Sequence, residues 1–121
     1  MENSITATAS LKNFRGSARK ARLILDMIRG KNVSKAKSIL QFSTKRMAKD
    51  IHKLLNSAVS NHIQSVGKID EKNLIVEKTW ADDAPIMKRH LPRAQGRATV
   101  IRKRSCHINI SLSTNETKVN E

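Results

Sequence analysis

The segment from Ala84 to Asn115 contains no aspartate or glutamate. Its cations are Lys88, Arg89, Arg93, Arg97, Arg102, Lys103 and Arg104, with His90 and His107 among them. A folded surface ordinarily carries both signs of charge, so an unrelieved cationic segment indicates an anionic partner. Arginine suits phosphate because its planar guanidinium makes paired hydrogen bonds to phosphate oxygens. The chemistry predicted for this segment is therefore the binding and neutralisation of a polyanion.

The whole chain favours the same partner. Its 121 residues have the length of one domain, and they carry a formal net charge of +14. Repulsion of this size destabilises the free protein, which indicates nucleic acid as the first candidate partner and an anionic membrane as the second. The only aromatic residues are Phe14, Phe42 and Trp80. Such scattered rings favour contacts to phosphate, sugar and RNA shape over the reading of single bases.

Membrane and secreted classes fit poorly. No apolar stretch is long enough to span a bilayer, and the basic segment lacks an amphipathic helix with bulky apolar anchors. The start, Met1 to Ser4, has neither a signal-peptide nor a transit-peptide layout. Cys106 is the only cysteine and lies on the apolar face of a predicted strand, which favours a small core residue in a reducing cytosol.

An enzyme is also disfavoured, because the residues that could do catalysis do not cluster. Asp82-Asp83 is predicted to start a turn, and Asp70-Glu71 lies in a polar loop. His52 and His62 point in different directions on one predicted helix. The four glycines are dispersed, so there is no phosphate-binding loop. We therefore predict no catalytic residue, metal site, cofactor or small-molecule substrate.

The first part of the chain predicts a strand and three helices. Apolar residues alternate from Ile5 to Leu11, and Gly16 ends that strand. Ser17 can cap a helix to about Arg29 that Gly30 closes, with an apolar face of Ala18, Ala21, Leu25 and Ile28. Ser34 is predicted to cap a helix through Leu40. Ser43 is predicted to begin a helix ending near Val66, with an apolar stripe of Met47, Ile51, Leu54, Leu55, Ala58 and Ile63. Lys45, Arg46, Lys49 and Lys53 are interpreted as its solvated face.

After a polar loop, Gly67 to Asn73, the period becomes that of strands. Leu74, Val76 and Trp80 are predicted to share one side of a strand, and Cys106, Ile108, Ile110 and Leu112 one side of another. Pro85 and Pro92 exclude the basic segment between them from the middle of a sheet. A two-stranded ribbon over residues 81–104 would tolerate the prolines. Each of its arms would reach roughly 40 Å, and it would need a partner to hold its shape.

Two stretches carry a resemblance to a known family. They are Arg19-Lys20-Ala21-Arg22-Leu23 with Ile28-Arg29-Gly30-Lys31, and Pro85, Lys88-Arg89, Pro92-Arg93-Ala94-Gln95-Gly96-Arg97-Ala98, Ile101-Arg102-Lys103-Arg104 and His107-Ile108. In order and spacing they resemble the first helix and the extended hairpin of the bacterial-type ribosomal protein L22 family (uL22). The likeness covers roughly residues 5–112.

The resemblance implies an α+β fold, with three helices packed on a small three-stranded antiparallel sheet and a long protruding β-hairpin. It implies a single domain over residues 1–121, with a globular part at about 5–80 and 105–113, the hairpin at about 81–104 and a polar tail at 114–121. It also implies a non-enzymatic constituent of the cytoplasmic large ribosomal subunit that aids assembly. Its partners would be 23S rRNA, neighbouring ribosomal proteins and the nascent polypeptide in the exit tunnel, with no membrane.

Specific residues follow from this reading. The predicted rRNA-binding residues of the hairpin are Lys88, Arg89, Arg93, Gln95, Gly96, Arg97, Arg102, Lys103 and Arg104. Those of the first helix region are Arg15, Arg19, Lys20, Arg22, Arg29 and Lys31. The tunnel-facing tip is predicted at Met87, Lys88, Arg89, His90 and Leu91. The rival binding class is a free basic nucleic-acid-binding protein of nucleoid type, which the long ribbon with two prolines fits less well.

Overall fold

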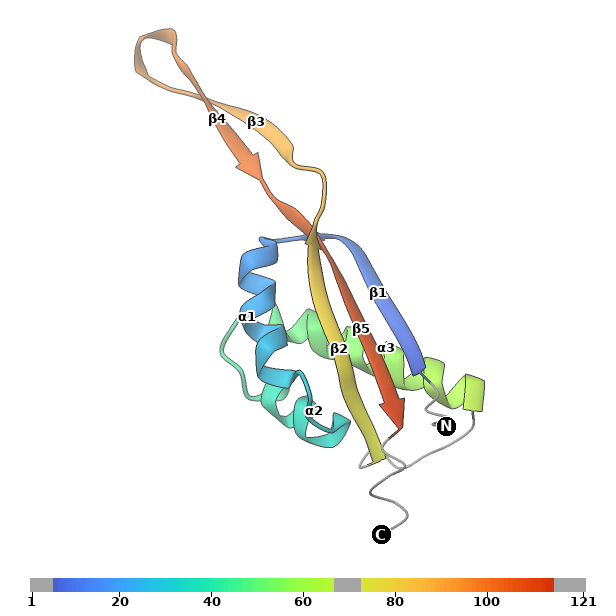
Figure 1. The fold of residues 1–121 in the computed structure, drawn as a ribbon. Helices are drawn as coiled ribbons and strands as arrows, with labels where there is room; N and C mark the ends of the chain where they lie inside the picture. Colours follow the sequence, from blue (N-terminus) through green and yellow to red (C-terminus); the bar gives the residue numbers. More distant parts are fainter. Residues whose placement is uncertain (1–5, 67–72, 115–121) are drawn as a thin grey trace.

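A computed structural model of the chain describes residues 6–66 and 73–114. Three helices lie on one side of a three-stranded antiparallel sheet, and a two-stranded hairpin extends beyond the end of that sheet (Figure 1). In chain order the elements are β1 (Thr6–Arg15), α1 (Ala18–Ile28), α2 (Val33–Gln41), α3 (Ala48–Val66), β2 (Leu74–Asp83), β3 (Met87–Pro92), the short 3-10 turn η2 (Ala94–Gly96), β4 (Ala98–Lys103) and β5 (Ser105–Thr114). The predicted α+β class is confirmed.

The strand β5 is the centre of the sheet, whose order is β1-β5-β2. Its four predicted inward residues, Cys106, Ile108, Ile110 and Leu112, are all fully buried, as the alternation indicated. Ala7 and Ala9 bring the inward face of β1 to the same core. Ile5, predicted to start that strand, lies outside the described residues.

The outer strand β2 corrects one prediction. Val76 pairs with Leu112 and Lys78 with Ser111, so Glu77 is an extra residue in a β-bulge. A bulge exchanges the two faces of a strand. Leu74 and Val76 therefore point inward as predicted, whereas beyond the bulge Thr79 and Ala81 are buried and Trp80 is 41% exposed. Placing Trp80 on the inner side was wrong because periodicity alone does not reveal a bulge.

The helix α1 begins and ends where the sequence predicted. The Ser17 hydroxyl accepts a hydrogen bond from the Arg19 N–H at 3.2 Å, and the four predicted inward residues are buried. Gly30 follows with φ +79°, a conformation that other residues adopt only with strain. Its N–H donates to the Val76 carbonyl at 2.9 Å, which ties the end of the helix to β2.

The cap of α2 is Asn32, not Ser34 as predicted. The Asn32 side-chain oxygen accepts from the Lys35 N–H at 2.9 Å, and Ser34 lies inside the first turn. Both residue types favour helix starts, so the sequence offers two candidates two positions apart. The β-bridge between Asn32 and Ile75 fixes the backbone at the first of them.

Replacing Asn32 with alanine is expected to lower the free energy of unfolding by about 1 kcal/mol, because the capped amide loses its acceptor. Ser34→Ala is the matched control and is expected to change it by less than about 0.5 kcal/mol. Urea unfolding followed by circular dichroism measures both. Equal losses in the two variants would contradict the assignment of the cap.

The helix α3 starts at Ala48 rather than at Ser43. The Ser43 hydroxyl instead accepts from the Lys45 N–H in the preceding turn. Five predicted stripe residues, Met47, Ile51, Leu54, Leu55 and Ala58, are buried. At the end of the stripe Ile63 is 40% exposed and His62 is buried in its place, since residues 51, 55, 58 and 62 keep the helical spacing. Of the predicted loop Gly67 to Asn73, residues 67–72 lie outside the described residues, as does the tail from residue 115.

Candidate nucleic-acid interface

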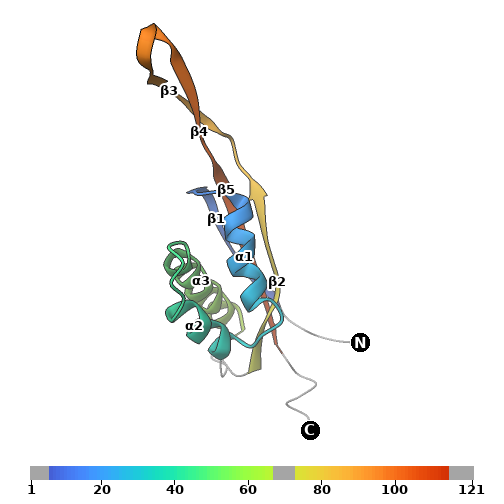
Figure 2. The ribbon, with the colours of Figure 1, turned by 90° about the vertical axis from the view of Figure 1, so that its left-hand side faces the viewer.

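The hairpin of β3 and β4 projects away from the helices and the sheet (Figures 1 and 2). The two strands pair from Met87 with Lys103 to Pro92 with Ala98, and every residue of both is exposed. An isolated two-stranded ribbon buries too little apolar surface to be stable in water on its own. The arm therefore has no buried apolar core of its own to stabilise it.

Cations lie on both faces of this ribbon. Side chains paired across the ladder share a face, and faces alternate along each strand. One face carries Met87, Arg89 and Leu91 with Thr99, Ile101 and Lys103, and the other carries Lys88, His90 and Pro92 with Ala98, Val100 and Arg102. Each face thus presents one lysine and one arginine, which suits insertion between two phosphate-bearing surfaces rather than docking on one.

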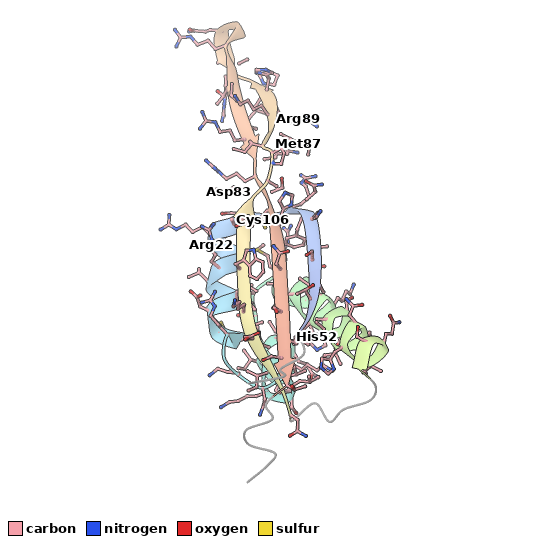
Figure 3. The ribbon with its side chains drawn as sticks, turned by 45° about the vertical axis from the view of Figure 1, so that its right-hand side comes forward. Arg22, His52, Asp83, Met87, Arg89 and Cys106 are labelled. Carbon is pink, nitrogen blue, oxygen red and sulfur yellow. The ribbon has the colours of Figure 1, made fainter. Side chains whose placement is uncertain are left out.

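The turn of the hairpin is Arg93 to Arg97, which corrects the predicted position of the tip. The Arg93 N–H donates to the Arg97 carbonyl at 2.6 Å, and Gln95 and Gly96 have φ values of +63° and +73°. Residues 87–91, predicted to be the tip, form β3, and Figure 3 shows Met87 and Arg89 on the part of the arm nearer the sheet. Gly96 adopts the left-handed turn conformation, and a Cβ at this position would meet no protein atom within 4 Å.

Amide hydrogens between Ile86 and Lys103 are expected to exchange with solvent much faster than those of β5 in the isolated protein. The arm has no buried side chain to hold its ladder closed, whereas β5 lies in the core. Hydrogen–deuterium exchange with mass spectrometry measures both segments in one sample. Protection of the arm comparable to that of β5 would contradict this expectation.

The base of the arm is fixed to the sheet by backbone hydrogen bonds. The Gly16 N–H donates to the Arg104 carbonyl at 3.1 Å, and the Ala84 N–H to the Ser105 carbonyl at 3.0 Å. Asp82-Asp83 does not start a turn as predicted but lies in β2, opposite His107 and Cys106. The hairpin was predicted to begin at about residue 81, but the pairing of β2 with β5 continues to Asp83. The arm leaves the sheet after that residue.

Two basic clefts flank the start of α1 beside this base. The first, which we call the α1–α3 cleft, is lined by Arg15, Gly16, Ser17, Lys20, Leu23, Ile24, Lys45, Arg46 and Met47. The second, which we call the hairpin-base cleft, is lined by Ser17, Arg19, Lys20, Arg22, Leu23, Asp83 and Arg104. The structure therefore joins the predicted helix cations to Arg104 of the arm.

Lys45 and Arg46 are the residues that sequence reasoning missed. They are exposed, as expected of a solvated face, but their placement on the third helix is wrong, because they precede α3 and line the α1–α3 cleft with Arg15 and Lys20. Only the fold brings these four cations together, because they come from two segments about 25 residues apart. Lys49 and Lys53 remain on the exposed part of α3.

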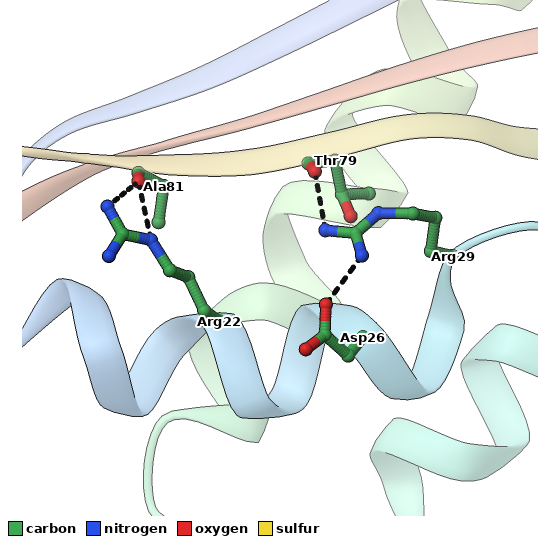
Figure 4. Close-up of polar contacts among 5 residues, drawn as sticks. All are labelled: Arg22, Asp26, Arg29, Thr79 and Ala81. Atoms are coloured by element: carbon green, nitrogen blue, oxygen red, sulfur yellow. Dashed lines mark hydrogen bonds and ion pairs between the residues drawn. The ribbon is translucent and has the colours of Figure 1, made fainter.

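Arg22 and Arg29, also predicted to bind RNA, make contacts within the protein (Figure 4). The Arg22 Nε and Nη2 donate to the Ala81 carbonyl at 3.1 and 2.8 Å. The Arg29 Nη2 donates to the Thr79 carbonyl at 2.9 Å, and its Nη1 pairs with Asp26 at 2.5 Å. Both arginines thus donate hydrogen bonds to backbone carbonyls on the outer edge of β2. Because these carbonyls are already paired, that edge is closed to pairing with another strand. Lys31 adds to this edge through its backbone carbonyl, which accepts from the Val76 N–H at 2.9 Å.

Arg22→Met is expected to lower the free energy of unfolding by about 1.5 kcal/mol, since two charge-assisted hydrogen bonds at the β2 edge are lost. Arg19→Met is the matched control, because the Arg19 guanidinium has no hydrogen bond to the rest of residues 6–66 or 73–114. Urea unfolding curves of the two variants measure the difference. A loss in Arg19→Met as large as in Arg22→Met would contradict the structural role of Arg22.

The remaining reactive side chains form no catalytic arrangement within the described ranges. Burial raises the pKa of the Cys106 thiol, as does the Asp83 carboxylate, while Arg22 lowers it. A thiol of raised pKa stays protonated at neutral pH and is a poor nucleophile. His52 lies on α3, away from Asp83 and Cys106 (Figure 3). Residues 6–66 and 73–114 contain no group of three histidine, cysteine or acidic side chains placed to hold a metal ion.

No helix in the described part of the chain is both long and apolar enough to cross a membrane.

Comparison with known proteins identifies the family to which the chain belongs. Residues 9–113 match the family model of ribosomal protein L22p/L17e. The chain is 50% identical over 113 residues to the large ribosomal subunit protein uL22 of Leptospira biflexa, covering 93% of this chain and 97% of that protein. It is 44% identical over 119 residues to the protein of the same name from Prochlorococcus marinus strain MIT 9312, covering 98% and 92%. The chain belongs to the ribosomal protein L22p/L17e family.

Proposed function

We propose that this chain is a structural constituent of the large ribosomal subunit that binds 23S rRNA, aids subunit assembly and lines the polypeptide exit tunnel with its hairpin. Its similar proteins carry the name large ribosomal subunit protein uL22. The observation that carries the proposal is the fully exposed arm with cations on both faces. The protein does no catalysis: it acts in the cytoplasm by holding RNA, with rRNA and other ribosomal proteins as its partners.

The arm's mechanism is charge neutralisation between RNA segments. Phosphates on closely packed RNA helices repel one another, and a ribbon with cations on two faces neutralises both sides at once. Arg93 and Arg97 at the turn, Arg102 in β4 and Arg104 at the base provide forked contacts along the whole arm. Lys88, Arg89, Lys103, Gln95 and Gly96 complete the proposed set.

The globular part makes the second contact. The two basic clefts bring cations of the β1 end, the α1 start and the segment before α3 beside the base of the arm. They suit the backbone of an RNA segment running past that base. Arg15, Arg19, Lys20, Lys45 and Arg46 are the proposed phosphate ligands there. Arg22 and Arg29 serve this surface indirectly by holding β2, and Lys31 stays a candidate at the end of α1.

The tunnel-facing surface is proposed at Met87, Lys88, Arg89, His90 and Leu91, together with the turn. Because residues 87–91 form a strand, they would contribute a length of tunnel wall rather than a point. Met87 and Leu91 share a face with Ile101, so this face offers a nascent chain a mixed apolar and basic surface.

Comparative binding separates this proposal from a free nucleoid protein that coats DNA. The full-length chain is titrated with a 23S rRNA fragment and with duplex DNA of equal length at the same salt concentration. We expect tight binding to the rRNA and weak binding to the DNA. Equal affinity for both would favour the nucleoid alternative and contradict the proposal.

A further inference from the structure

One face of the three-stranded sheet carries no helix within residues 6–66 and 73–114. Figure 2 shows α1, α2 and α3 on the other side of the strands. At the middle of the open face one cross-strand row runs from Ser10 in β1 through Asn109 in β5 to Trp80 in β2. The bulge at Glu77 is what brings the indole to this side.

The groups around Trp80 are polar and oriented. The Ser10 hydroxyl donates to the Asn109 Oδ1 at 2.6 Å, which leaves the Asn109 amide NH2 to donate to a ligand. In the next row the Asn13 N–H donates to the His107 Nδ1 at 3.0 Å, so the neutral ring carries its proton on Nε2. Asp82 lies opposite His107 and on the same face as Trp80, about 7 Å along the strand.

We propose that this face binds an unpaired RNA base, stacked on the Trp80 indole and hydrogen-bonded at its edge by Asn109 and Asp82. The inference rests on the proposed function, which supplies RNA as the partner, and it adds the nucleotide contact. The three rings of the chain are too scattered to form a platform for several bases, but one exposed aromatic ring on an open sheet is a stacking surface for a single unpaired base. The row of Ser10, Asn109 and Trp80 carries no charge, which suits a neutral base, while Arg15 and Arg104 lie near one end of the sheet for the flanking phosphates.

The surrounding chemistry favours a base over a protein partner. The cores of protein–protein interfaces are apolar, whereas the indole here lies beside the Asn109 amide across the ladder and near the Asp82 carboxylate on its own strand. A carboxylate only accepts hydrogen bonds, so Asp82 takes an N–H from the base, which adenine, cytosine and guanine offer as an exocyclic amino group and uracil only as its ring N3–H. Adenine is expected to be preferred to uracil because it combines this amino group with a larger ring system for stacking on the indole.

Trp80 is the only tryptophan and reports on its own site by fluorescence. The full-length protein is titrated with single-stranded eight-nucleotide RNAs of adenosine or uridine and with an RNA duplex of eight base pairs, all at one salt concentration. We expect the adenosine strand to quench Trp80 and to bind more tightly than the uridine strand. The duplex is expected to bind without quenching.

Matched variants of Trp80 and Asp82 test their roles in binding the base. The affinity of each variant is measured by the fluorescence anisotropy of labelled RNA. Trp80→Leu is expected to weaken binding of the adenosine strand about 10-fold or more and leave duplex binding unchanged, whereas Trp80→Phe keeps most of the affinity. Asp82→Asn is expected to reduce the preference for adenosine over uridine. Circular dichroism and urea unfolding check that each variant is folded.

The double variant Arg93→Ala, Arg97→Ala separates the proposed rRNA-binding function from the proposed stacking site at Trp80. It is expected to weaken binding of every RNA while leaving the quenching at saturation intact. If it does so but Trp80→Leu binds the adenosine strand like the parent protein, the stacking site is wrong and the rRNA-binding function stands. If no RNA binds the parent protein, both fail. A Trp80 spectral change caused by RNA-free large-subunit proteins, with none caused by RNA, would assign the face to a protein and overturn the inference.

Discussion

Alanine at both Arg93 and Arg97 is expected to weaken binding to 23S rRNA about 100-fold near physiological salt. Both residues belong to the turn of an arm that buries nothing within the protein. The Arg93 Nε donates to the Thr99 Oγ1 at 3.4 Å, which leaves its two Nη atoms, and the whole Arg97 guanidinium, available to phosphate. A hydrogen bond to a charged group contributes about 1.5 kcal/mol or more, and each loss of about 1.4 kcal/mol weakens binding tenfold. The dependence of log K on log salt is expected to become shallower by about 1.5, since two phosphate contacts no longer release counterions.

The matched control is Lys49→Ala with Lys53→Ala, which removes the same charge from the exposed part of α3. It is expected to weaken binding by less than about threefold, because exposed charges distant from the contact act only through a screened field. Filter binding at four salt concentrations measures both doubles. An unchanged salt slope in the arginine double would rule out direct phosphate contacts at the turn.

Ile110→Ala is expected to lower the free energy of unfolding by about 2–5 kcal/mol. Ile110 is fully buried in the central strand β5, where its deletion leaves a cavity between the sheet and the helices. This loss is a large part of the 5–15 kcal/mol that typically stabilises a domain. Urea unfolding followed by circular dichroism measures it.

Val100→Ala in the arm is the contrasting variant, because that side chain is exposed and packs on no core. It is expected to change the stability by less than about 0.5 kcal/mol. A loss in Val100→Ala similar to that in Ile110→Ala would mean that the arm contributes to folding. The claim that the globular part alone provides the stability, while the arm depends on a partner for its shape, would then be wrong.

Much of the fold could be predicted because the apolar periodicity and the helix-capping residues in the sequence agreed with the burial of side chains in the structure. The alternation in Cys106 to Leu112 marked the central strand, and Ser17 with Gly30 marked both ends of α1. The features that escaped prediction depend on contacts distant in sequence. The bulge at Glu77 is set by pairing with β5, and the cap at Asn32 by its bridge to β2. Neither leaves a periodic signal in its own segment.

In the candidate site, too, some features were visible in the sequence and others depended on contacts between distant segments. The acid-free run of cations identified the arm, since charge composition needs no fold to be visible. The predicted tip, Met87 to Leu91, lies in β3, although the sequence holds a local signal for the turn in Gly96, which adopts positive φ. The joining of Lys45 and Arg46 to Arg15 required the packing of two segments distant in sequence. The internal use of Arg22 and Arg29 required knowing that β2 is an edge strand.

Sedimentation of a cell lysate through a sucrose gradient, with fractions probed for this protein, tests the central claim most directly. Large subunits are washed at high salt before a second gradient, because peripheral basic proteins dissociate as their phosphate contacts are screened. We expect the chain to stay with the large subunit through the wash, because an arm enclosed by rRNA, as proposed above, would not be released when exposed phosphate contacts are screened. Recovery of the chain free, or with DNA, would contradict it.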